Sequence, residues 1–465
     1  MKRILIALFL IASFSAQSQE IIGQWYGKLA IQGTELRLVF NINKNENGYS
    51  STMDSPDQGA KGIPVKSTNY ENGILKIEMP NIKLEYSGEL KSGTITGNLK
   101  QNGMSFPMNL SKEAIQKKIA LRPQEPKKPY PYYSEDITIE NKKDNITLAG
   151  TLSLPKKEGK FPVVVLISGS GPQNRDEELL GHKPFLVLSD YLTRNGIAVL
   201  RFDDRGVASS TGDFKSATSL DFASDVEAGI QYLKTRKEIN KNKIGLIGHS
   251  EGGLIAPMVA SKLKDVDFIV LLAGTGVTGE EILLLQQELI GRVSGISEKD
   301  LMQSKNTNKG AFEIVKKGTS QEEMIKELTF YFEKIIKETP ETEKPKEVKE
   351  EEYVKMMVDE LSNPWMQFFI TYNPAVSLEK VKCPVLAING EKDLQVPAKV
   401  NLEAIKKALD KAKNKKSTVM ELPNLNHLFQ ECKTGSPEEY ATIEETFSPK
   451  ALEVVKNWIQ TRVKK

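Results

Sequence analysis

The hexapeptide Gly-His-Ser-Glu-Gly-Gly at residues 248–253 constrains the fold of this chain more than any other segment. A short apolar run typical of a buried strand precedes it, and a stretch compatible with a helix follows it at residues 254–263. A serine at such a strand-to-helix turn adopts strained backbone, and a glycine two positions away on each side avoids clashes with neighbouring elements. The pattern predicts that the Ser250 hydroxyl stands clear of a sheet, with the Glu251 N–H at a helix N-terminus directed toward an oxyanion.

Strands and helices alternate around this turn. Continuous apolar strands are predicted at residues 161–168, 198–203, 243–248, 268–273, 383–389 and 418–422, with amphipathic helices between most of them. Strands that are apolar on both faces are typical of a parallel sheet covered by helices on both sides. We therefore expect an α/β fold with a mostly parallel, doubly wound sheet. Residues 275–380 show helical patterns without a strand, which predicts a helical cap at the carboxyl edge of that sheet.

The preceding region has a different pattern. Residues 19–112 contain short alternating segments separated by turn signals such as Asn72-Gly73, which predicts a small all-β barrel or sandwich. Four prolines between positions 123 and 131 indicate a semi-rigid linker at residues 113–133, so the α/β domain is expected at residues 134–465. The β domain is interpreted as a structural module without a ligand, with glycan or lipid binding as the alternative.

The first residues resemble an export signal. Two basic residues, an apolar run and Ala-Gln-Ser predict a signal peptide at residues 1–18, cut after Ser18, and hence a periplasmic or secreted protein. No apolar run is long enough to span a bilayer. A net charge of +3, with lysines spread along the chain, argues against a nucleic-acid partner. Cys383 and Cys432 are expected at opposite ends of the sheet, about 20 Å apart, and hence as two free, mostly buried thiols.

A serine nucleophile needs a base and a group that orients the base. The loops that follow the strands at 383–389 and 418–422 carry Asp393 and His427, and both loops should meet at the carboxyl edge of the sheet. Of the three histidines, His249 should point away from the Ser250 hydroxyl and His182 lacks such a position, so His427 is the predicted base. Glu391 competes with Asp393 for the acid role, and loop position favours Asp393.

The order Ser250, Asp393, His427 together with the elbow motif resembles the α/β-hydrolase superfamily over residues 134–465, and in particular a branch of exported bacterial serine esterases. Ser168-Gly169-Ser170-Gly171-Pro172 resembles the family's H-G-x-G oxyanion loop, with Ser168 where the family has histidine. The resemblance implies the Ser170 and Glu251 N–H groups as oxyanion donors.

Two further segments accompany this resemblance. Asp203 to Ser210 resembles a D-x-R-G-x-G-x-S segment of bacterial members, in which we expect Arg205 to pair with a carboxylate and brace the edge of the sheet. Residues 174–177, just after the oxyanion loop, are expected to face the mouth of the site.

These features predict a serine hydrolase that cleaves small carboxylic esters, including acyl groups on a glycan or peptide, through an acyl-enzyme. No His pair or Cys cluster has the spacing of metal ligands, so neither a metal nor an organic cofactor is expected. The alternative is a serine peptidase of the aminopeptidase or dipeptidyl-peptidase type. That activity would require cap carboxylates, such as those of Glu280 and Glu281, to bind a peptide amine.

Overall fold

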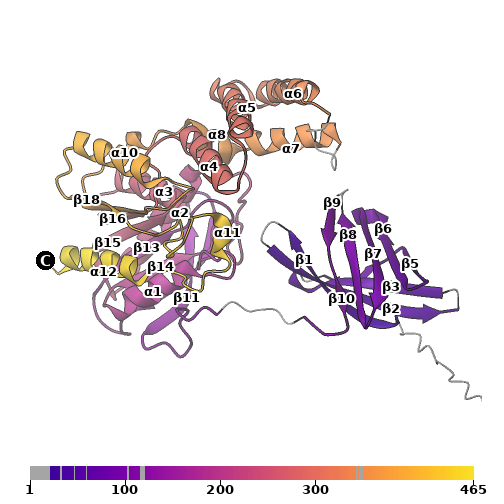
Figure 1. Cartoon of the computed structure of the whole chain (residues 1–465). Helices are drawn as coiled ribbons and strands as arrows, with labels where there is room; N and C mark the ends of the chain where they lie inside the picture. The colour runs from indigo at the N-terminus through magenta and orange to yellow at the C-terminus, as the bar shows by residue number, and fades with distance from the viewer. Residues whose placement is uncertain are drawn as a thin grey trace, which may run out of the picture. The chain divides into compact units, whose positions relative to one another are not determined.

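The computed structural model describes residues 21–464, apart from residues 32–33, 47, 59, 102–103, 116–120, 342–343 and 345–348. The predicted signal peptide at residues 1–18 and part of the predicted linker lie outside the described residues. The chain divides into two compact units, Met1–Lys118 and Ile119–Lys465, which are drawn in Figure 1 and described separately here.

The first unit is a closed antiparallel barrel rather than a sandwich. Its strands are β1 (Gly23–Ile31), β2 (Thr34–Asn45), β3 (Gly48–Ser55), β4 (Ala60–Pro64), β5 (Ser67–Glu71), β6 (Ile74–Met79), β7 (Leu84–Lys91), β8 (Thr94–Gln101), β9 (Met104–Pro107) and β10 (Leu110–Ser111). The ring runs β1-β2-β3-β5-β6-β7-β8-β10 and closes because the short β10 pairs with both β8 and β1.

Side chains fill the interior of this barrel. Burial alternates strictly along β6 and the start of β7, as a strand with one face inward requires. Trp25, Phe40 and Tyr86 are among the largest fully buried side chains, and the Trp25 Nε1–H donates to the Ile21 carbonyl at 2.6 Å. An eight-stranded barrel is just wide enough for side chains to fill its interior or to hold one small ligand, so the interpretation as a structural module stays a prediction.

The second unit is built on one eight-stranded sheet. Its strands are β11 (Tyr133–Asn141), β12 (Ile146–Leu154), β13 (Phe161–Ile167), β14 (Ala198–Phe202), β15 (Ile239–His249), β16 (Val266–Leu272), β17 (Val385–Gly390) and β18 (Ser417–Leu422). The order is β11-β12-β14-β13-β15-β16-β17-β18, and every pairing from β14 to β18 is parallel. The hairpin β11–β12 adds two antiparallel strands at one edge.

Helices cover both faces of this sheet. The covering helices are α1 (Pro184–Arg194), α2 (Ser219–Thr235), α3 (Glu251–Ala260), α10 (Ala398–Lys411) and α12 (Pro449–Val463). One buried cluster joins the sheet to α2, α3 and α10, and a second joins the opposite face to α1 and α12. Successive strand residues alternate between the clusters, as with Val163 and Val164, which explains why these strands are continuously apolar.

Several helices between β16 and β17 gather beyond one end of the sheet (Figure 1). They are α4 (Gly279–Val293), α5 (Glu298–Lys316), α6 (Gln321–Glu338), α7 (Glu350–Ser362) and α8 (Pro364–Thr371). The short helix α9 (Ala375–Leu378) follows them and packs against α3 and α10. Among the described residues, no strand interrupts this segment and no helix is long and apolar enough to cross a membrane.

The proline-rich segment is partly bound to the second unit. Arg122 donates to the carbonyl oxygens of Ala441 and Ile443. The Gln124 amide donates to the Phe447 carbonyl and accepts the Phe447 N–H. This end of the expected linker is therefore a fixed part of the second unit's surface.

Candidate active site

The carboxyl ends of the parallel strands bring the predicted site segments together. β13 leads into the Ser168 loop, β15 ends at His249 beside Ser250, β17 leads to Asp393 and β18 leads to His427. Because these strands are close neighbours in one parallel sheet, their carboxyl ends share an edge.

The turn at Ser250 has the geometry of a nucleophile elbow. Ser250 adopts φ 53° and ψ −115°, a conformation that non-glycine residues avoid. A Cβ at Gly248 would lie 1.9 Å from the Gly252 oxygen, and a Cβ at Gly252 would lie 2.1 Å from the Ile167 oxygen. Glycine at both positions is therefore what allows helix α3 to start directly against the ends of β13 and β15.

Asp393 rather than Glu391 contacts the histidine. The Asp393 Oδ2 atom lies 2.8 Å from His427 Nδ1, and its Oδ1 atom accepts the N–H groups of Gln395 and Val396, both at 2.8 Å. Glu391 instead accepts the backbone N–H of Asn424. A carboxylate held by two backbone donors fixes the imidazole with Nδ1–H toward Asp393, which leaves Nε2 free to take a proton.

The described residues include no hydrogen bond between Ser250 and His427, but the residue before the serine packs on the histidine ring. The ring of His249, the residue before the serine, has its centroid 4.8 Å from that of His427. Within the described residues, the Ser250 hydroxyl has no hydrogen-bond partner. Catalytic hydrogen bonds commonly tighten only once substrate is bound.

The loop after β13 lies directly against Ser250. A Cβ placed on Gly169 would be 3.2 Å from the Ser250 Cβ atom. The backbone N–H groups of Ser170 and Glu251 donate to no group in the described part of the chain, so both are available to an oxyanion.

The Asp204 carboxyl group accepts two hydrogen bonds from the loop that contains Ser168. The Ser168 hydroxyl donates to Asp204 Oδ1 at 2.7 Å, and the Gln173 N–H donates to Oδ2 at 3.0 Å, so one carboxyl closes the loop at both ends. Burial raises the pKa of Asp204 to about 8, and the neighbouring Glu251 and Glu177 carboxyls act in the same direction.

The expectation that residues 174–177 face the mouth of the site is wrong. Arg175 forms two bonds with the Asp203 carboxylate, at 3.0 and 2.7 Å. Glu177 is buried and accepts both the Gly169 N–H and a hydrogen bond from His249 Nδ1. Two charged side chains of this segment, Arg175 and Glu177, therefore pair with buried groups of the protein instead of facing the mouth of the site.

The other singled-out residues have structural partners. Arg205 contacts Asp225 and Asp144, each at 2.7 Å, which confirms that it braces the edge of the sheet. His182 is fully buried with its Nε2 atom 2.8 Å from the Tyr440 carbonyl, and burial lowers its pKa. Neither side chain is positioned to act as a base toward Ser250.

One contact from the cap was not predicted. Trp365 of α8 donates through Nε1 to Glu251 Oε1 at 2.8 Å, and the Ser219 hydroxyl donates to the same oxygen at 2.6 Å. Burial raises the pKa of Glu251. The cap therefore contacts the side chain of the residue whose N–H is a predicted oxyanion donor, and no sequence spacing indicates a pairing across more than a hundred residues.

The two cysteines are free thiols, as expected, but both are half-buried rather than mostly buried. Burial raises the pKa of Cys383 to about 12. Within the described ranges, no group of three or more His, Cys, Asp or Glu side chains is arranged to hold a metal ion.

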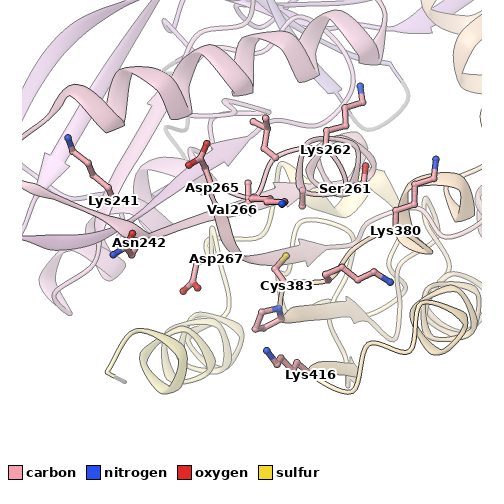
Figure 2. Close-up of a pocket in the computed structure, with 15 residues that line it drawn as sticks. Lys241, Asn242, Ser261, Lys262, Asp265, Val266, Asp267, Lys380, Cys383 and Lys416 are labelled. Carbon is pink, nitrogen blue, oxygen red and sulfur yellow. The ribbon is translucent and has the colours of Figure 1, made fainter.

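A large hollow lies at the opposite, amino edge of the sheet. It encloses about 560 Å³ and is lined by Cys383 and by lysines on several loops (Figure 2). Lys262 and Lys264 follow the C-terminal end of α3, and Lys380 follows that of α9. Helix C-termini carry partial negative charge, so lysines at these ends have a structural explanation.

A mostly parallel sheet with a strained serine elbow, a buried Asp–His pair on later loops and an inserted helical cap is typical of the α/β-hydrolase class. Residues 226–340, which include Ser250, match the family described as "BAAT / Acyl-CoA thioester hydrolase C terminal". Esterase EstD of Thermotoga maritima is 29% identical over 173 residues, which cover 37% of this chain and 40% of that protein. The chain thus spans less than half the length of this esterase.

Solved structures of esterases align over more of the chain. The Pyrococcus furiosus esterase Pf2001 covers 71% of this chain and 93% of its own, with 17% identity and a TM-score of 0.40. Est1E from Butyrivibrio proteoclasticus, solved with ferulic acid bound, covers 71% of this chain and 100% of its own, with 18% identity and a TM-score of 0.41. The family match and the curated esterase support a hydrolase of the α/β-hydrolase type, and they do not favour the peptidase alternative.

Proposed function

We propose that this protein is an exported serine hydrolase that cleaves carboxylic esters through an acyl-enzyme. The observation that carries the proposal is the buried Asp393–His427 pair at the same sheet edge as the strained Ser250 elbow. Export rests on the predicted signal peptide.

In the proposed reaction, His427 Nε2 takes the Ser250 hydroxyl proton while Ser250 Oγ attacks the ester carbonyl. The Ser170 and Glu251 N–H groups stabilise the resulting oxyanion, a contribution of about 10²–10³ in rate for each donor of this kind. His427 then protonates the leaving alcohol as the carbon–oxygen bond breaks. Water, deprotonated by His427, attacks the acyl-enzyme and releases the acid and free Ser250.

An acyl thioester is the second candidate substrate class, because the matched family is described by acyl-CoA thioester hydrolysis and the match includes the elbow. A thioester would form the same acyl-enzyme and release a thiol, which needs less help from a general acid than an alcohol does.

The test compares nitrophenyl esters of short and long acyl chains, acyl thioesters and aminoacyl anilides, using the wild-type protein and Ser250→Ala. We expect ester or thioester turnover that Ser250→Ala reduces by a factor of about 10⁴ or more. Anilide cleavage without ester preference would contradict the esterase proposal. Near wild-type activity in Ser250→Ala would contradict the whole mechanism.

A further inference from the structure

Three loops of the site meet at one buried side chain that the proposed reaction does not use. His249 lies between Glu177, whose Oε1 atom is 2.9 Å from Nδ1, and the backbone carbonyl of His427, whose oxygen is 3.0 Å from Nε2. The ring is buried, as is the Glu177 side chain. His249 thus connects the segment after the oxyanion loop, the elbow and the base loop.

The partners of the ring determine its protonation. A carbonyl oxygen can only accept, so Nε2 of His249 carries a hydrogen. Glu177 Oε1 already accepts the Gly169 N–H at 2.7 Å, and an oxygen that accepts two hydrogen bonds is best served by an ionised carboxylate. Nδ1 then carries a hydrogen as well, which makes the ring an imidazolium.

Electrostatics agree with this assignment. Burial by itself disfavours the charged ring, but the charge and hydrogen bond of Glu177, the His427 carbonyl and the charge of Asp393 together raise the pKa of His249. The titratable groups that face the ring are Glu177, Asp393 and the His427 imidazole.

The same pair fixes the oxyanion loop. Gly169, which donates to Glu177, lies against Ser250 and directly precedes Ser170, whose N–H is a proposed oxyanion donor. Glu177 itself has φ 51°, and strained backbone of this kind persists only where the surroundings hold it.

We propose that His249 and Glu177 form a buried imidazolium–carboxylate pair that positions the oxyanion loop and the base loop against Ser250. The pair touches neither substrate nor reacting atoms, so both are positioning residues. This inference rests on the proposed function, since it assigns the pair a role in the same reaction. A displacement of about 1 Å at such a loop costs on the order of 10²-fold in rate.

Kinetics of Glu177→Gln and His249→Gln test the proposal, with active sites counted by a phosphonate inhibitor taken to completion. We expect kcat per active site to fall by roughly 10- to 100-fold with KM changed by less than about threefold. The double variant should lose little more than the worse single one, because the two residues act as a unit. His182→Gln is the matched control: it removes another buried histidine, and its kcat per active site should stay within about threefold of wild type.

A folded Glu177→Gln with unchanged kcat per active site would overturn the proposal, since a purely structural role would lower only the yield or the melting temperature. If both variants fail to fold, a measurement on the wild-type protein can still test whether His249 is an imidazolium. With only three histidines in the chain, ¹⁵N NMR of the labelled protein at neutral pH should show both nitrogens of His249 protonated. A neutral His249 would overturn the inference. Full activity in Ser250→Ala would instead refute the proposed reaction and leave the NMR result intact.

Discussion

The two edges of the second unit's sheet use charged side chains in opposite ways. At the carboxyl edge, Glu177, Asp204, Glu251 and Asp393 are all buried and each has a hydrogen-bond partner. At the amino edge, exposed lysines surround the open hollow, and Lys262 and Lys380 make no ion pair with any described residue.

The difference shows that hollow size is a poor guide to chemistry here. The proposed acyl transfer needs hydrogen-bond donors and a base that are already fixed in place and shielded from water when the substrate binds. Preorganised groups of this kind stabilise developing charge most strongly where the dielectric constant is low. Among the described residues that line these two regions, the buried groups with fixed partners lie at the carboxyl edge. The lysines around the hollow are exposed to solvent, where charge contributes little.

The strongest test of this contrast compares two carboxylates of one loop. Asp393→Asn should lower kcat/KM for a nitrophenyl ester by about 10³–10⁴, because an amide in this place favours the wrong imidazole tautomer. Glu391→Gln, which removes the negative charge but keeps an oxygen that can accept the Asn424 N–H, should stay within about threefold of wild type. Steady-state kinetics of both variants measure this. Equal losses would mean that the loop matters for folding rather than for orienting His427.

Asp204 offers a pH test of burial at the carboxyl edge. Its pKa rises from 3.8 to about 8 on folding, so between these values the folded protein keeps a proton that the unfolded chain has released. Its contribution to the free energy of unfolding therefore falls as pH rises from about 4 to about 8, by at most about 1.4 kcal/mol per pH unit. Asp204→Asn should become more stable relative to wild type over this range, as melting temperatures will show.

The neighbouring Asp203 is the control, because its pKa is shifted in the opposite direction to that of Asp204. Burial opposes ionisation there, but the hydrogen bonds and charge of Arg175 lower the pKa of Asp203 below its ordinary value. Its stabilisation is present at neutral pH and is lost as pH falls through that lowered pKa. The deficit of Asp203→Asn should thus shrink toward acid pH. A parallel response of the two variants would contradict the assignment of Asp204 as a buried, protonated acid.

The sequence could predict the parts of the site that depend on strand order. The Ser250 elbow follows from glycine spacing, and the placement of Asp393 beside His427 follows from two loops at the ends of adjacent parallel strands. The hairpin pattern predicts a small barrel or sandwich but cannot decide between them. Closure of the barrel depends on the two-residue strand β10, which is too short to show periodicity.

What the sequence could not predict are contacts between loops far apart in the chain. Glu177 and Trp365 look like solvent-facing and core residues in their own segments, and only the fold brings them to His249 and Glu251. The sequence shows Ser168 where the resembled oxyanion loop has histidine, but only the structure shows that its hydroxyl donates to Asp204.

A smaller effect is expected where the cap meets the carboxyl edge. Trp365→Phe keeps an aromatic ring that can stack on Phe369 but removes the hydrogen bond to Glu251, so kcat should fall by roughly three- to tenfold. Trp458→Phe is the matched control, because Trp458 lies on helix α12 and the substitution loses an indole hydrogen bond to Thr418 of strand β18. Ester kinetics should separate the two variants. Identical kinetics would show that the cap contact does not influence the oxyanion donor.

The smallest effect is expected at the amino edge. Lys262 directly follows the last residues of α3, so Lys262→Gln should lower the free energy of unfolding by about 0.3–1 kcal/mol at low ionic strength, and by less in high salt. Lys416, which lies further beyond the end of α10, should matter less. Urea unfolding at two salt concentrations measures both, and kcat/KM should change by less than about twofold. A large loss of ester turnover in Lys262→Gln would contradict the difference between the two edges. An exposed lysine beyond the C-terminal end of α3 would then influence the reaction at the N-terminal end of the same helix.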